Sequence, residues 1–112
     1  MPDNAIILVN SSTALKELRA TLARETAIAV YTEADSLYSY FDKVCLLQIS
    51  TRDADYVVDP LAVDLKPLAP IFAEARVEKT FHSAEYDILC LKRDYGFEFA
   101  NIFDTMIANS KP

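Results

Sequence analysis

The stretch Ala27-Ile28-Ala29-Val30-Tyr31-Thr32-Glu33 organises the rest of this chain. Its small and β-branched residues, bounded by charge, predict a central strand that is buried on both faces. Because side chains alternate across a strand, Tyr31 and Glu33 are expected to lie on the same side. One carboxylate does not make a metal site, so Glu33 taken alone is interpreted as a residue that ends a strand at the surface.

The length and composition indicate one domain with a hydrophobic core. The 112 residues, of which 52% are hydrophobic, suit a single domain spanning residues 1–112. No apolar run is long enough to cross a bilayer, so no membrane partner is expected. Cys45 and Cys90 lie in apolar segments and are interpreted as buried thiols of a reducing compartment, which predicts a cytoplasmic protein. The net charge of −6 argues against bulk electrostatic binding of nucleic acid, but it is compatible with an acidic site that binds cations.

The hydrophobic pattern predicts strands and helices that alternate along most of the chain. Strands are expected at residues 6–9, 27–33, 44–50, 55–59, 77–81 and 101–103. Helices are expected from the cap residues 10–13 to about Arg24, from Asp64 as a short or irregular helix, from Ala84 to Tyr95, and from Asp104 onward. Gly96 lies where a left-handed C-cap is needed. Helices between strands imply parallel crossovers and the hairpin implies antiparallel pairing, so a mixed α/β sheet is predicted.

Three acidic residues fall at or just beyond the carboxyl ends of predicted strands, namely Glu33, Asp87 and Asp104. Ligands of open α/β sheets bind at these ends. Taken on its own, Asp87 is an acid favoured by the dipole at a helix start, and Asp104 is interpreted as a helix cap. His82 and Gln48 are interpreted as hydrogen-bonded structural residues.

Five stretches in order resemble the ribonuclease D-like 3′–5′ exonucleases, members of the DEDD group with a ribonuclease H-like fold. These stretches are residues 29–33, 45–49, 57–61, 81–87 and 102–105. The resemblance extends along all 112 residues. It implies an α/β domain with a mixed five-stranded sheet and helices on both faces. The C-terminal helices of that fold are missing, so an incomplete domain is expected.

The resemblance also implies a site. The family's first motif, Asp-x-Glu, places two carboxylates on one face of a strand, where two divalent metal ions about 3.5–4 Å apart bind them and the scissile phosphate. Glu33 matches the Glu of this motif, and Asp87 matches the Asp of the second motif, so both are predicted catalytic metal ligands. Tyr31 occupies the position of the first-motif Asp. The third motif, Tyr- or His-x-x-x-Asp, is not matched in its expected element.

The tyrosine at position 31 weakens the predicted metal site. A phenol has a pKa of about 10 and is neutral at pH 7, whereas Mg²⁺ prefers carboxylate oxygens. Two of the family's four metal carboxylates are matched in this chain. We therefore expect weak or absent binding of Mg²⁺ or Mn²⁺, and inactive or strongly impaired hydrolysis.

The expected partner is the 3′ end of a single strand of RNA or DNA. The alternative is a non-catalytic nucleic-acid-binding or scaffold domain that kept the fold. The loop after the first-motif strand would either stack on unpaired bases or pack on the core through its aromatic residues, which are Tyr38, Tyr40 and Phe41. A homodimer is predicted through apolar residues near the C-terminal end, which are Ile102, Phe103, Met106 and Ile107.

Overall fold

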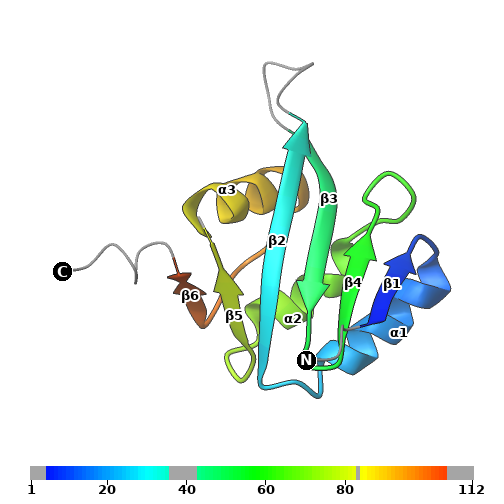
Figure 1. Ribbon diagram of the computed structural model, residues 1–112. Helices are drawn as coiled ribbons and strands as arrows, with labels where there is room; N and C mark the ends of the chain where they lie inside the picture. Colours follow the sequence, from blue (N-terminus) through cyan, green and yellow to red (C-terminus); the bar gives the residue numbers. More distant parts are fainter. Residues whose placement is uncertain (1–4, 36–42, 83, 106–112) are drawn as a thin grey trace.

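The computed structural model describes residues 5–35, 43–82 and 84–105, which form one sheet with helices packed against it (Figure 1). The sheet has six strands in the order β1-β4-β3-β2-β5-β6. The elements in chain order are β1 (Ala5–Val9), α1 (Ser12–Leu22), β2 (Ala27–Asp35), β3 (Lys43–Ser50), β4 (Ala54–Val58), the 3₁₀ turn η1 (Lys66–Leu68), α2 (Ala69–Ala73), β5 (Glu78–Phe81), α3 (Ala84–Tyr95) and β6 (Ile102–Asp104).

The sheet is mixed, which confirms the predicted α/β class. Strands β2, β3 and β4 form an antiparallel meander, and β5 and β6 run parallel to β2. The sheet has six strands where five were expected. The sixth is β1, the strand that the sequence predicts at residues 6–9 but that the five-stranded sheet of the resemblance did not include, and it pairs in parallel with β4 at one edge.

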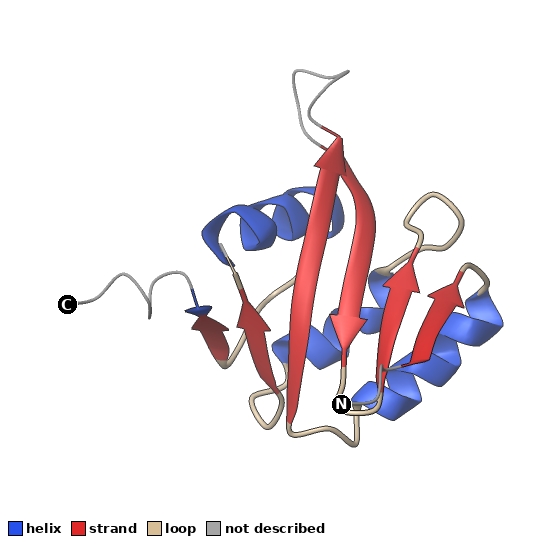
Figure 2. Cartoon of the chain, viewed as in Figure 1, coloured by secondary structure: helices blue, strands red, loops and turns tan. Residues whose placement is uncertain are grey.

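In the described part of the chain, the helices cover one face of the sheet, not both as expected (Figure 2). The inward residues Ile28 and Val30 of β2 join a single core with buried residues of α1, α2 and α3. The alternate residues Ala27 and Ala29 are exposed, so β2 is buried on one face only. Two buried faces were expected because every residue from Ala27 to Val30 is apolar. The expectation was wrong because the larger side chains of this stretch all point to the same face. We call the uncovered side of the sheet the open face.

Local signals position the helices as the sequence predicts. The Ser11 hydroxyl accepts a hydrogen bond from the backbone N–H of Ala14 at 3.1 Å and caps α1. The Asp64 carboxylate accepts from the N–H of Lys66 at 3.0 Å, after which η1 and α2 span only three and five residues. Gly96 ends α3 with a φ of 69°, so the left-handed C-cap is confirmed.

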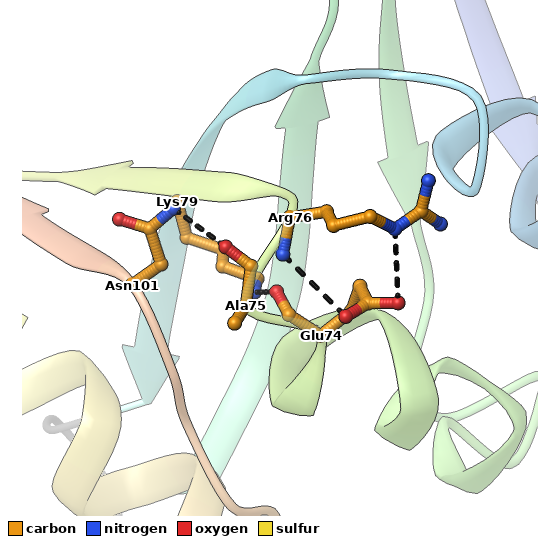
Figure 3. A network of polar contacts seen from close by, with 5 residues as sticks. All are labelled: Glu74, Ala75, Arg76, Lys79 and Asn101. Atoms are coloured by element: carbon orange, nitrogen blue, oxygen red, sulfur yellow. Dashed lines mark hydrogen bonds and ion pairs between the residues drawn. The ribbon is translucent and has the colours of Figure 1, made fainter.

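A buried lysine ties the turn before β5 to the start of β6 (Figure 3). Lys79 has no exposed surface, and burial lowers the pKa of its ammonium group. Its Nζ donates to the backbone carbonyl of Glu74, the C-cap of α2, and to that of Ala100 at 3.0 Å. The sequence pattern gives no sign of this burial, because lysine in a strand is usually exposed.

Two further contacts hold the same turn. The Asn101 side-chain amide donates to the Ala75 carbonyl at 2.8 Å, and Asn101 takes a positive φ of 58°. Arg76 and Glu74 form an ion pair of 3.3 Å that lies largely in solvent. The contacts of Lys79 and Asn101 join the turn before β5 to the segment that leads into β6, whereas the Arg76–Glu74 pair lies within the turn itself.

No helix in the described ranges is both long enough and apolar enough to cross a bilayer. The helix expected from Asp104 onward falls mainly in residues 106–112, which lie outside the described residues.

Candidate functional site

The parallel strands β2, β5 and β6 bring their carboxyl ends to one edge of the sheet (Figure 1). Glu33 lies near the end of β2, and Asp104 is the last residue of β6. Asp87 lies in the first turn of α3, the helix that follows β5. Each acid therefore lies at or just beyond the carboxyl end of its strand, as the sequence predicts, but Glu33 lies three residues beyond Val30, which pairs with Phe81 at the end of β5.

Asp87 is held by a hydrogen bond that sequence analysis missed. The Thr32 hydroxyl donates to Asp87 Oδ1 at 2.7 Å and joins β2 to α3. Thr32 is 7% exposed and Asp87 is 4% exposed, so this contact lies inside the protein. A usable signal was present, because Thr32 continues the inward row of Ile28 and Val30, and a buried hydroxyl needs a partner.

The second carboxylate oxygen of Asp87 is buried without a partner. Asp87 Oδ2 makes no hydrogen bond within the described part of the chain. Burial raises the pKa of the Asp87 carboxyl above its usual value, and hydrogen bonds from Thr32 oppose this shift. The negative charge of Asp104 raises this pKa further, while His82 lowers it. Asp104, interpreted from sequence as a helix cap, and His82 therefore both lie within electrostatic reach of Asp87.

Tyr31 and Glu33 point away from that group. Both side chains are exposed on the open face, as alternation along β2 requires. Their neighbour Thr32 faces α3, so the predicted first-motif pair and Asp87 occupy different sides of β2. The strand register also shifts between Glu33 and Ala34. The catalytic and metal roles of these residues stay predictions.

His82 makes the hydrogen bond that the sequence predicted, since its Nδ1 lies 2.9 Å from Thr105 Oγ1. Gln48 pairs with Tyr31 across β3 and β2 and lies on the open face, not in the buried core where the sequence placed it. The aromatic residues of the loop at 36–42 lie outside the described residues, as do Met106 and Ile107 of the predicted dimer surface. Dimer formation therefore stays a prediction.

The residues that the structure describes do not fit a two-metal centre. Asp87 Oδ2, a buried acceptor without a partner, would suit one cation. The described ranges nevertheless contain no group of three or more His, Cys, Asp or Glu side chains that could hold a metal ion. Two bridged divalent ions need more carboxylates than this edge of the sheet brings together.

Comparison with known proteins identifies relatives of this chain. A family described as 3′-5′ exonuclease matches residues 6–111. The exosome complex exonuclease RRP6 of Saccharomyces cerevisiae is 39% identical over 109 residues, which is 96% of this chain and 15% of that protein. The crystal structure of the catalytic core of RRP6 from Trypanosoma brucei superposes with a TM-score of 0.88 at 41% identity, covering 94% of this chain and 30% of that one.

A second structure carries a nucleic acid. The RNase D of Trypanosoma brucei, solved in complex with RNA U12, shares the fold with a TM-score of 0.83 at 18% identity. The match covers 92% of this chain and 38% of that one. This chain therefore corresponds to a small part of each of these proteins.

Proposed function

The chain belongs to the 3′–5′ exonuclease family, related to RRP6 and RNase D, and from this premise we propose that it binds the 3′ end of single-stranded RNA and hydrolyses it poorly or not at all. The proposal rests on Tyr31, whose phenol side chain is exposed on the open face and which we match with the first-motif Asp of the family. The family depends on divalent metal ions, and a phenol is a poor ligand for them.

We propose RNA, and not DNA, as the ligand because of what is described for similar proteins. The RNase D that shares the fold is described with a bound RNA. The net charge of −6 gives little general attraction for phosphates, so binding would rest on base contacts at a chain end. A shallow dependence of affinity on salt follows from this argument.

The metal site is proposed to bind Mg²⁺ or Mn²⁺ weakly. Glu33 and Asp87 remain as matched carboxylates, but Asp87 is engaged by Thr32 on the other side of β2. Titration calorimetry with Mn²⁺ measures this affinity directly. Tight binding of two ions would contradict the proposal.

The activity is tested with a short 5′-labelled single-stranded RNA in Mg²⁺, in Mn²⁺ and in EDTA. We expect fluorescence anisotropy to report binding in all three, and a denaturing gel to show no shortened products. A circular RNA of the same sequence is the control, and it should bind more weakly because it has no 3′ end. Metal-dependent shortening would refute the loss of hydrolysis, and equal binding of the circle would refute end recognition.

Tyr31→Asp is the informative variant. It restores one carboxylate but leaves the third motif unmatched, so we expect this 112-residue chain to remain without exonuclease products. The scaffold alternative predicts a different outcome, which is no RNA binding by the unaltered chain in any condition.

A further inference from the structure

The open face of the sheet carries a cavity of about 260 Å³ beside the candidate site. Polar side chains from four strands or their ends line it, namely Tyr31, Gln48, Ser50, Thr80, His82 and Thr105. The strand register brings them together, since Tyr31 pairs with Gln48 and Ala29 lies between Ser50 and Thr80. Tyr31 and Thr105, which are 74 positions apart in the chain, thus line the same cavity.

Most of these polar groups are available to a ligand. Within the described residues, the side chains of Tyr31, Gln48, Ser50 and Thr80 make no hydrogen bond to another residue. A phenol, an amide and two hydroxyl groups therefore offer both donors and acceptors at the cavity wall. Such convergent polar groups in a concave site are typical of specific ligand binding.

The ring of His82 is fixed in one tautomer. Thr105 Oγ1 donates its single hydrogen to the Phe81 carbonyl at 3.2 Å, so it can only accept at its 2.9 Å contact with His82 Nδ1. Nδ1 therefore donates to Thr105, and in this tautomer of the imidazole the lone pair lies on Nε2. The cavity thus gains an oriented acceptor.

The lining indicates the chemistry of the ligand. Its described residues include no Lys, Arg, Asp or Glu, so this part of the wall is not suited to hold a phosphate or a metal ion. An amide such as that of Gln48 pairs with the edge of a base, adenine above all, and the exposed ring of Tyr31 offers a stacking surface. The volume lies just below the roughly 300–1,000 Å³ of sites for drug-sized ligands, which suits a single base or nucleoside.

We propose that this cavity binds one unpaired nucleobase, which stacks on Tyr31 and hydrogen-bonds to Gln48 and to His82 Nε2. The inference deepens the proposed function, on which it rests, by naming the group of the RNA that this surface recognises. Tyr31 would then replace a metal ligand with a base contact, so the same residue that impairs hydrolysis supports binding.

Calorimetry in EDTA with adenosine, AMP and ribose 5-phosphate as probes tests the cavity. We expect adenosine and AMP to bind with similar affinity and ribose 5-phosphate not to bind. Tyr31→Ala should weaken AMP binding about tenfold, as expected when a stacking ring is lost, whereas Tyr31→Phe should keep it. Ile6→Ala, exposed on the same sheet near its other edge, is the matched control and should bind as the unaltered chain does.

Two results would overturn the inference. One is unchanged AMP binding by Tyr31→Ala, and the other is binding of ribose 5-phosphate as tight as that of AMP. Absence of nucleoside binding together with self-association would also overturn it, since a second copy would then cover the open face. The labelled RNA separates this failure from that of the proposed function. If RNA still binds while Tyr31→Ala changes nothing, only the cavity assignment is lost; if RNA does not bind at all, the proposed function is lost.

Discussion

Replacing Thr32 with valine removes the hydroxyl that links β2 to Asp87 in α3 while leaving the side-chain shape nearly unchanged. Valine is also β-branched, so the preference of β2 for an extended backbone is kept. A hydrogen bond to a charged group contributes about 1.5–3 kcal/mol to stability. With Thr32 at 7% and Asp87 at 4% exposure, water has little access to replace the lost donor. We expect Thr32→Val to lower the free energy of unfolding by about 2 kcal/mol at pH 7, and Tm by about 10 °C.

The loss should depend on pH, because the bond stabilises the ionised form of Asp87. Burial raises the pKa of this carboxyl above 3.8 in the folded protein. The contribution of such a group to stability is fully present below its unfolded pKa and is lost as the pH rises through its folded pKa. Thr32 opposes that shift, so its removal raises the folded pKa further. The deficit of Thr32→Val should therefore be largest at neutral pH and shrink as the pH falls through the folded pKa toward 3.8.

Urea unfolding between pH 4 and pH 7 measures both effects. Thr32→Ser keeps the hydroxyl and should lose less than about 1 kcal/mol. Thr80→Val is the matched control in β5, where the hydroxyl makes no hydrogen bond within the described residues, and it should change stability by at most about 0.5 kcal/mol. The reasoning is refuted if the serine and valine variants at position 32 lose equal stability, or if the loss is the same at every pH.

Three further predictions test other parts of the chain. Lys79→Met should destabilise the fold by about 2 kcal/mol in urea unfolding because two backbone carbonyls lose their donor, whereas Arg76→Ala, in an exposed ion pair, should change it by at most about 0.5 kcal/mol; equal effects would contradict this contrast. Gly96→Ala should cost about 1–2 kcal/mol, from backbone strain alone, because apart from its chain neighbours no described residue has a heavy atom within 4 Å of the new Cβ; a much larger loss would indicate a steric clash. Sedimentation at micromolar concentration should show a species heavier than the 12.6 kDa monomer that Phe103→Glu dissociates, and a single monomeric species at all concentrations would rule the association out.

Local sequence signals set where the helices of this protein begin and end. Three such signals act through neighbours a few residues away. They are Ser11 as a cap, the prolines that shorten the segment from η1 to α2, and Gly96 at a left-handed position. Their effects are set by backbone geometry and do not depend on the rest of the fold. The same holds for the alternation along β2, which places Tyr31 and Glu33 on one side.

The side of the sheet that is covered, and the contacts between distant groups, depend on how the whole domain packs. The sequence of a mostly apolar strand does not indicate on which side of the sheet the helices pack. The open face beside β2 could therefore not be predicted from residues 27–33. The Thr32–Asp87 bond joins residues 55 positions apart, and the cavity gathers side chains from four strands through their register. The burial of Lys79 likewise depends on two carbonyl groups that only the folded chain brings within reach. Contacts of this kind arise from packing of the whole domain, whereas the sequence pattern specifies only the periodicity of each element.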